Sequence, residues 1–214
     1  RSTLFPYTTL FRSTNLLHKQ LPGKEVKRRQ LAALLMLVGS GLGLLASFVL
    51  SIESLTLAKN SHAVLNCDLN AAMSCSTVAN HWSAAPLGFP NSFIGMMTLP
   101  VMVTIAVALL AGTKFPKWFM WGAQLGAVAG LLFAGWMFYM SYVEIGALCP
   151  WCLTLDAGML LIFYGLTRHN VLNKIIEHRG LRRFVDQGYD TLVLASVAAL
   201  VIMAILAKFG SQIV

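Results

Sequence analysis

The chain has 214 residues, of which 57% are hydrophobic and only 11% are charged, and its mean hydropathy is +0.70. A soluble domain carries about 25% charged residues, so the composition excludes a soluble globular protein and indicates an integral membrane protein. Basic residues collect on the cytoplasmic side of membrane proteins, which explains the formal net charge of +8. No nucleic-acid-binding motif or Gly-rich phosphate loop is present, so no nucleic acid is expected as a partner.

The first 30 residues are polar and precede the first long apolar run. Residues 1–13, RSTLFPYTTLFRS, resemble a translated adapter, and we interpret them as a non-native linker scar; a disordered natural tail is the alternative. Residues 14–30 carry five basic side chains and are predicted to form a cytoplasmic basic N-terminus. A signal peptide is disfavoured, because the following apolar run is too long and no small-residue cleavage site is obvious.

Five apolar runs predict membrane-spanning helices, since about 20 apolar residues cross a bilayer. They lie at about residues 31–52, 93–112, 118–143, 149–167 and 189–208. The predicted fold is an all-α integral membrane protein: a four-helix transmembrane bundle over 31–188, then a fifth transmembrane helix and tail over 189–214. Pro100 predicts a kink in the second span. Glycines in the first and third spans predict close helix packing, namely Gly39, Gly41, Gly43, Gly122, Gly126 and Gly130.

The distribution of basic residues predicts the topology. If the first, third and fifth spans run outward, the inner side holds twelve basic residues, in segment 14–30, at positions 114 and 117, and in loop 168–188. The outer side holds Lys59, with Lys208 at its edge. The positive-inside rule then predicts a multi-pass protein of the cell membrane with a cytoplasmic N-terminus and an extracytoplasmic loop at 53–92.

Cys149-Pro150-Trp151-Cys152 begins the fourth apolar run and is predicted to be a reactive dithiol. In the first turn of a helix the two cysteines share a face, and proline suits the first helical position because its missing N–H has no partner there. The free amides of a helix start favour thiolate over thiol. A structural disulfide and half of a zinc site are the alternatives for this motif.

Cys67 and Cys75 form the second pair, in the loop at 53–92. Seven intervening residues suit a mobile loop closed by a disulfide, whereas a zinc knuckle usually has two to four, so no metal site is predicted. The second and third spans separate the two pairs, and an even number of crossings returns the chain to the same face. All four cysteines can therefore meet at one membrane surface, on the oxidising side of the membrane.

Three separated motifs resemble the vitamin K epoxide reductase (VKOR) family in order, spacing and topology over about residues 30–170. They are Cys67-x7-Cys75-Ser76, Asn91-Ser92-Phe93-Ile94-Gly95 and Cys149-x-x-Cys152. The fifth span is similar to the bacterial members, many of which carry a fused thioredoxin-like domain. A bacterial-type homologue without that domain is expected here.

The resemblance implies a quinone-dependent thiol–disulfide oxidoreductase. An extracytoplasmic thioredoxin-like (DsbA-like) protein would exchange disulfides with Cys67 and Cys75, Cys75 would engage Cys149, and Cys152 would face a membrane quinone, menaquinone or ubiquinone. Each exchange is a thiolate attack through a mixed disulfide. The protein would thereby reoxidise its partner and support disulfide bond formation in secreted proteins.

The resemblance also implies the quinone-binding residues. Asn91 matches the family's asparagine that hydrogen-bonds a quinone carbonyl, and its alternative role is a helix N-cap. Phe93, in the same motif, is predicted to line the site. Residues 76–90 place Val78 and Trp82 one turn apart, which predicts a short amphipathic cap over the quinone; an interfacial anchor is the alternative for Trp82.

Asp156 stands where many family members have a tyrosine that offers its hydroxyl to the quinone. An acid inside a span is costly and usually functional, so Asp156 is predicted to donate to the quinone or to deliver protons, unless it pairs with Thr154 or Gln124. Three residues compete for the family's Ser or Thr position after the second loop cysteine: Thr77, His81 and Ser83. Glu53 and Glu144 are expected to be interfacial, and the remaining histidines solvated: His18, His62, His169 and His178.

Three other functions compete with this interpretation. The DsbB type also carries two cysteine pairs around four helices, but its CxxC motif comes first in the chain, whereas here it comes last. A transporter of a thiophilic metal would place cysteines deep in the spans or on the cytoplasmic face. A disulfide-stapled membrane scaffold would lose stability, and no activity, when its cysteines are replaced.

Overall fold

The computed structural model describes residues 23–70 and 72–213. The predicted linker scar at 1–13, and the part of the basic segment before residue 23, lie outside these residues. Within them every regular element is a helix, apart from one isolated bridge that pairs Met73 with Leu148.

Five of the described helices are long and apolar enough to cross a membrane, which confirms the predicted all-α membrane fold. They are α2 (Gly23–Lys59), α4 (Ser92–Leu110), α5 (Lys117–Tyr139), α6 (Pro150–Leu172) and α8 (Tyr189–Ile213). A π-helical segment, η2 (Met140–Ile145), continues α5. Pro100 lies inside α4. Helix α2 continues seven residues beyond the predicted end of the first span, so the start of the predicted loop 53–92 is helical.

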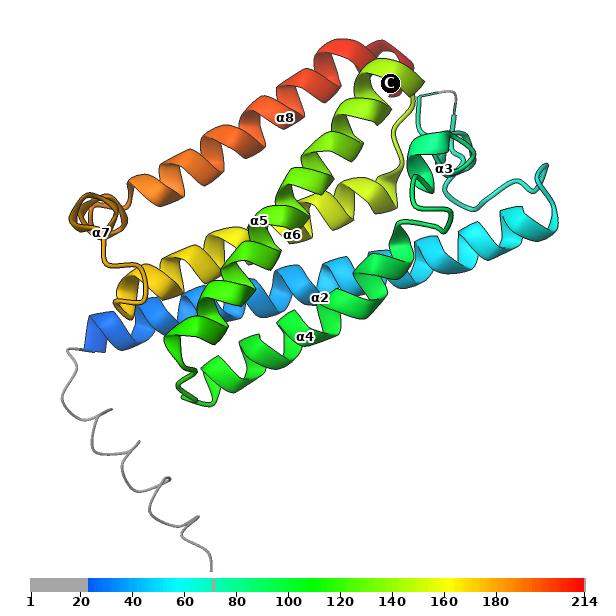
Figure 1. Cartoon of the computed structure of the whole chain (residues 1–214). Helices are drawn as coiled ribbons and strands as arrows, with labels where there is room; N and C mark the ends of the chain where they lie inside the picture. The colour runs from blue at the N-terminus through cyan, green and yellow to red at the C-terminus, as the bar shows by residue number, and fades with distance from the viewer. Residues whose placement is uncertain (1–22, 71, 214) are drawn as a thin grey trace, which may run out of the picture.

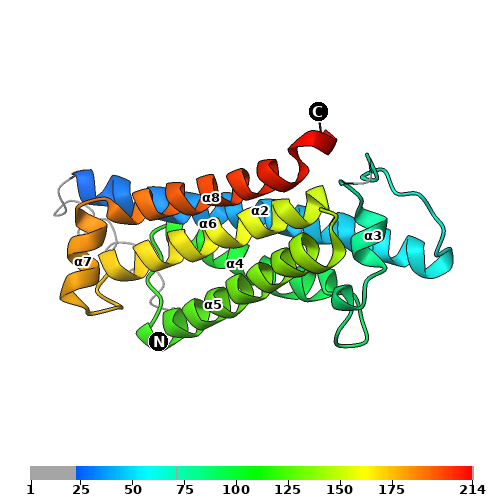
Figure 2. The ribbon, with the colours of Figure 1, turned by 90° about the horizontal axis from the view of Figure 1, so that it is seen from above.

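Helices α2, α4, α5 and α6 form the bundle, with α2 packed against both α6 and α4, and α5 packed against α6 (Figure 1). The chain runs up and down through the bundle, so the loop after α2 and the start of α6 come to the same end. Short helices α3 (Cys75–Ala79) and η1 (Trp82–Ala84) lie at that end, and α7 (Arg179–Asp186) lies at the other, as Figure 2 shows from above.

Glycines allow the backbones of α2 and α6 to touch. A Cβ added at Gly158 would lie 2.6 Å from the carbonyl oxygen of Gly39, and one added at Gly165 would lie 2.6 Å from that of Ala32. The predicted packing role is therefore correct for Gly39, whose added Cβ would lie 2.7 Å from Gly158 O. It is wrong for Gly41, because a Cβ added there would have no atom of another helix within 4 Å.

The segment predicted as a cytoplasmic loop, 168–188, is largely helical. Helix α6 extends to Leu172, and residues 179–186 form α7. Arg168 is consequently a bundle residue: its Nη1 donates to Asp190 Oδ2 of α8 over 2.7 Å, and both side chains are about 10% exposed or less. This buried ion pair ties the fifth helix to the bundle.

Candidate functional site

The CPWC motif opens helix α6 in the way that its sequence predicts. Cys149 is the N-cap residue and has an extended backbone, with φ −107° and ψ 122°, and Pro150 occupies the first turn. The Cys149 sulfur accepts a hydrogen bond from the backbone N–H of Cys152 over 3.4 Å. Proline at this position sacrifices no helical hydrogen bond, while the free amides around it turn toward the cysteine sulfur.

Cys67 and Cys75 are joined by a disulfide, with their Cα atoms 5.7 Å apart. A short backbone pairing holds this loop against the segment before the CPWC motif. The N–H of Ser74 donates to Leu148 O over 2.9 Å, and the N–H of Leu148 donates to Ala72 O over 2.8 Å. The residue before Cys75 is thus bonded to the residue before Cys149, which fixes the two cysteines side by side.

The Sγ atoms of Cys149 and Cys75 lie 3.1 Å apart. Cys149 and Cys152 are free thiols, and Cys75 and Cys149 are each only 1% exposed. Apolar side chains surround the sulfurs, among them Leu57, Leu65 and Val78. A free thiol in contact with a disulfide sulfur, sheltered from water, is the arrangement that disulfide exchange requires.

Hydrogen bonds lower the pKa of the attacking thiol. The Cys152 thiol makes the largest contribution, and the backbone N–H groups of Cys152 and Trp151 add to it, so that together they outweigh burial and hold the pKa of Cys149 below its ordinary value. Because the thiolate is the nucleophile, this environment favours Cys149 as the reactive sulfur of the CPWC pair.

Asp68 organises the loop beside the disulfide. Its carboxylate accepts from the N–H of Leu65 over 2.8 Å, from the N–H of Ser76 over 2.9 Å and from the hydroxyl of Ser74 over 2.9 Å. Burial raises the pKa of Asp68, but these hydrogen bonds outweigh it and lower the pKa below its ordinary value. An ionised Asp68 therefore holds together the turn that carries Cys67 and the start of α3.

Glu53 reaches the same disulfide from α2. Its Oε1 lies 3.1 Å from Cys67 Sγ, and the residue is 9% exposed. The ligand atoms of Glu53, Cys67 and Cys75 fall within 4.8 Å of one another. Both sulfurs are committed to their mutual bond, however, and a metal would need them as thiolates.

The family model of the vitamin K epoxide reductase family matches residues 34–167. The chain belongs to the vitamin K epoxide reductase family. The match covers α4, α5 and most of α2 and α6, together with both cysteine pairs, which is the region that the sequence motifs predict. A search of curated proteins found no match.

Asn91 lies at the N-cap of α4 but makes no capping hydrogen bond. The predicted N-cap position is therefore confirmed, but the Asn91 side chain does not cap the helix. Its Nδ2 donates to Ser83 O of η1 over 2.7 Å and contacts Met137 Sδ of α5 at 3.5 Å. Its Oδ1 is buried with no hydrogen-bond partner in the described part of the chain.

Trp82 directly precedes Ser83, whose carbonyl oxygen accepts the hydrogen bond from Asn91. Its ring is 6.1 Å from that of Trp136 on α5, and the residue is 63% exposed. Val78, in contrast, is buried against the cysteines. The predicted amphipathic cap spanning both residues is therefore wrong: α3 and η1 are separate, and Val78 and Trp82 face different surroundings. Phe93 lies partly buried on the first turn of α4.

Asp156 lies partly buried on α6, one turn beyond Cys152. Neither predicted polar neighbour pairs with it: the Thr154 hydroxyl donates to Pro150 O, and the Gln124 amide donates to Thr167 Oγ1. In the stretches that the structure describes, Asp156 has no hydrogen-bond partner. The polar network of α5 and α6 thus leaves Asp156 available to another group.

Three other expectations are resolved in part. Among the candidates for the family's Ser or Thr, Ser83 is fully buried and its hydroxyl lies 2.9 Å from His81 Nδ1, whereas Thr77 is exposed. His169 is not solvated, because it is partly buried on α6 and its Nε2 lies 3.0 Å from Asn173 Nδ2. His18 falls outside the described residues.

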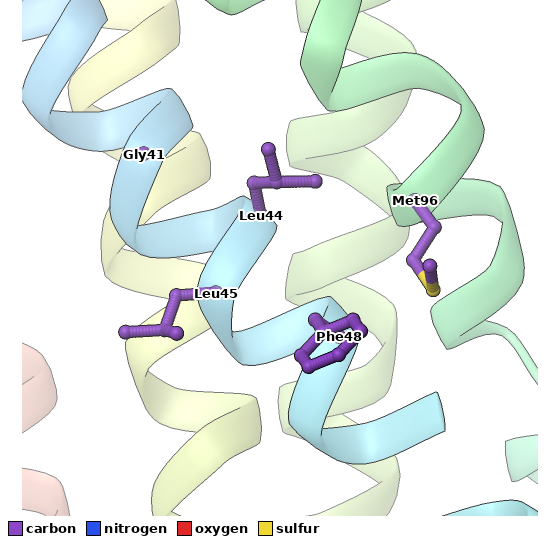
Figure 3. Close-up of a pocket in the computed structure, with 5 residues that line it drawn as sticks. All are labelled: Gly41, Leu44, Leu45, Phe48 and Met96. Carbon is purple, nitrogen blue, oxygen red and sulfur yellow. The ribbon is translucent and has the colours of Figure 1, made fainter. Parts of the chain in front are cut away.

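A shallow groove of about 420 Å³ runs between α2 and α4. Figure 3 shows its lining, which is Gly41, Leu44, Leu45, Phe48 and Met96. None of these side chains is charged or can donate a hydrogen bond, so the groove does not meet the needs of a quinone head group, which requires polar groups for its carbonyls. It is an apolar surface on two helices that are long and apolar enough to cross a membrane.

Proposed function

We propose that this protein is a quinone-linked thiol–disulfide oxidoreductase that reoxidises a thioredoxin-like partner. The observation that carries the proposal is the 3.1 Å contact between the free thiol of Cys149 and the Cys75 sulfur of the loop disulfide. Membership of the VKOR family supports the same reaction class.

Electrons enter at the loop pair. Cys67 is 6% exposed and Cys75 only 1%, so Cys67 is the sulfur that a partner thiolate attacks, once the loop moves to admit it. The attack forms a mixed disulfide and releases Cys75 as thiolate; the second partner thiol then resolves that bond and leaves both loop cysteines reduced. The partner departs oxidised.

The two pairs then exchange. Cys75 thiolate attacks Cys149 in the Cys149–Cys152 disulfide, and Cys152 leaves as the thiolate. Cys67 next attacks Cys75, which releases Cys149 and restores the loop disulfide. The arrangement described above, with an oxidised loop pair and a reduced CPWC pair, corresponds to the product of this transfer.

A bound quinone supplies the two-electron acceptor that returns Cys149 and Cys152 to a disulfide. Polar groups without a protein partner are available for such a group. Among the described residues, Asn91 has a buried Oδ1 without a hydrogen-bond partner, suited to a quinol hydroxyl. Asp156, partly buried on the second turn of α6, makes no hydrogen bond to any of these residues. Asn91 and Asp156 would hold the two oxygens, while Trp82 and Phe93 would cover the ring.

The direction of the bundle in the membrane follows from charge. Helix α7, with its three arginines, lies at the end of the bundle opposite α3, which begins at Cys75 (Figure 2). Lys114, in the turn between α4 and α5, adds another basic residue to the predicted inner side. The positive-inside rule puts that end in the cytoplasm and the cysteines on the extracytoplasmic side of the cell membrane, where a DsbA-like partner meets them.

The test is quinone reduction by purified protein in detergent, with a reduced thioredoxin-like protein or a small dithiol as donor. Wild type is expected to turn over with both donors, and Cys152→Ser with neither. Cys67→Ser is expected to lose activity with the protein donor and to keep some with the dithiol. A folded wild type that reduces no quinone contradicts the enzyme and returns the disulfide-stapled scaffold as the explanation.

A further inference from the structure

Glu53 is the only carboxyl group in the described chain that contacts a cysteine sulfur. It lies on the last two turns of α2, and its Oε1 is 3.1 Å from Cys67 Sγ. Its Oε2 is buried and has no hydrogen-bond partner among the described residues. An acid in the apolar cluster around the disulfide requires an explanation, since burying a charged carboxylate without a partner is costly.

The contact shows where the proton lies. A disulfide sulfur carries no hydrogen, so Cys67 cannot donate to the carboxyl group in this state. No described basic side chain pairs with Glu53, and the charged groups that act on it electrostatically are themselves acidic: Asp68 from the loop and, from the start of α6, Cys149 and Cys152. The arrangement is favourable only if Glu53 is protonated and donates to Cys67 Sγ.

We propose that Glu53 is a catalytic residue of the exchange, the group that takes the proton from Cys67 and returns it. The inference rests on the proposed function, because it concerns the transfer between the two cysteine pairs. It assigns a role to a side chain that is expected from sequence to be interfacial.

In both directions of the exchange, one proton moves between Glu53 and Cys67. In the forward direction, Glu53 carboxylate accepts the proton of Cys67–SH; the Cys67 sulfur bonds to Cys75, the Cys75–Cys149 bond breaks, and its electron pair leaves on Cys149. This leaves Glu53 protonated, with its Oε1 3.1 Å from Cys67 Sγ, the distance found in the structure. In reverse, Cys149 thiolate attacks Cys75, the electron pair of the breaking bond goes to Cys67, and Glu53 gives it the proton.

The reverse step can be measured without quinone or partner in a Cys152→Ser background. Cys67 is bonded in the resting disulfide and becomes free only when Cys149 bonds to Cys75. With saturating alkylating reagent, the rate of Cys67 labelling, followed by mass spectrometry, therefore reports the exchange. Glu53→Gln removes the proton and keeps the shape, Glu53→Asp keeps the acid, and Glu144→Gln removes an exposed acid of η2 as the matched control.

General acid–base catalysis contributes about 10²–10⁴-fold. We expect Glu53→Gln to slow Cys67 labelling by at least about 100-fold, Glu53→Asp to slow it less, and Glu144→Gln to leave it unchanged. In the parent, the rate of Cys67 labelling should rise with pH as Cys149 ionises and fall again as Glu53 loses its proton. In Glu53→Gln the fall at higher pH should disappear from this pH–rate profile. If Glu53→Gln fails to fold, Glu53→Asp is expected to retain that fall.

The role of Glu53 is overturned if Cys67 is labelled in Glu53→Gln at the rate of the parent. It is also overturned if Glu53→Gln and Glu53→Asp slow labelling equally and the pH profile of the labelling rate stays that of the parent. Absence of Cys67 labelling in the parent overturns the exchange route, and the role of Glu53 with it. Labelling that depends on Glu53 in a protein that reduces no quinone removes the proposed acceptor and leaves the role of Glu53 standing.

Discussion

Replacing Gly158 by alanine tests how closely the two central helices must approach. The added Cβ would lie 2.6 Å from Gly39 O, 3.2 Å from Gly43 N and 3.3 Å from Gly43 Cα. All three are backbone atoms of α2, so no side-chain rotation relieves the contact. Ordinary van der Waals contact begins at 3.4 Å, and the two backbones must therefore separate by about 0.8 Å in this seam.

The magnitude follows from two opposing effects. Overpacking costs about 1–3 kcal/mol, while alanine in place of glycine returns up to about 1 kcal/mol of helix propensity. We expect a net loss of about 1–2 kcal/mol in the free energy of unfolding. Because α6 begins at the CPWC motif, the shift also moves Cys149 relative to Cys75, so exchange between the pairs should slow as well.

Unfolding in detergent by increasing denaturing surfactant, followed by circular dichroism, measures the stability change. Gly122→Ala is the matched control, because nothing lies within 4 Å of the added Cβ, and it should leave stability unchanged or slightly raised. A Gly158→Ala protein as stable as Gly122→Ala, with an unchanged rate of exchange, would refute the reasoning that backbone contact sets the position of α6.

Three further predictions concern charge and hydrogen bonding. Asp68→Asn should speed hydrogen exchange of the two amides that donate to this carboxylate by about 10- to 100-fold, since a charged hydrogen bond contributes about 1.5–3 kcal/mol. The pKa of Asp68 is lower in the folded protein than in the unfolded chain. The two amides of the wild-type loop should therefore stay protected above the unfolded pKa of about 3.9 and lose this protection as pH falls through the folded pKa. Protection that is independent of pH contradicts this. Asp190→Asn should lower the free energy of unfolding by about 3–5 kcal/mol, because it leaves the buried charge of Arg168 without its ion-pair partner. The Arg168→Met, Asp190→Leu double variant should have a free energy of unfolding close to that of wild type. Equal losses of stability in the two variants would exclude the charge explanation. Cys152→Ala removes the largest cause of the lowered pKa of Cys149, so the thiolate absorbance should appear at higher pH than in wild type, and an unmoved titration counts against that hydrogen bond.

Much of this architecture follows from patterns that are local or countable. Hydropathy alone locates the five spans, because each is a continuous apolar run. Proline after a cysteine predicts the start of α6, and the structure has Pro150 in its first turn. The meeting of the two cysteine pairs follows from the parity of the crossings between them, and does not depend on the details of the loop.

The remainder depends on contacts between distant segments. Glu53 is expected at an interface only because the first span is predicted to end at residue 52, whereas α2 continues to Lys59 and brings its carboxyl group to a loop fourteen residues later. Glycine spacing is only a partial guide for the same reason: the predicted close packing is confirmed at Gly130, where an added Cβ would clash with the Met159 side chain of α6, but not along the rest of the series. Gly122 and Gly126 recur on one face of α5, yet an added Cβ finds nothing within 4 Å at the first and only Met102 Cε, at 3.9 Å, at the second.

Helix α7 has a sequence signal that hydropathy over long windows does not detect. It is eight residues long, rich in arginine, and carries Leu181 and Val185 four residues apart on its packed face. Apolar residues at that spacing among charged ones indicate an amphipathic helix. A search for short amphipathic segments inside the basic loop would therefore have found it.

The most direct test of the account is whether Cys75 and Cys149 bond to each other. In a Cys67→Ser, Cys152→Ser double variant these are the two cysteines that remain. Mild oxidation of the purified protein in detergent, followed by digestion and mass spectrometry, should yield a Cys75–Cys149 disulfide, because the two sulfurs lie 3.1 Å apart. Two thiols that stay free in a folded double variant would contradict the transfer of electrons between the loop pair and the CPWC motif.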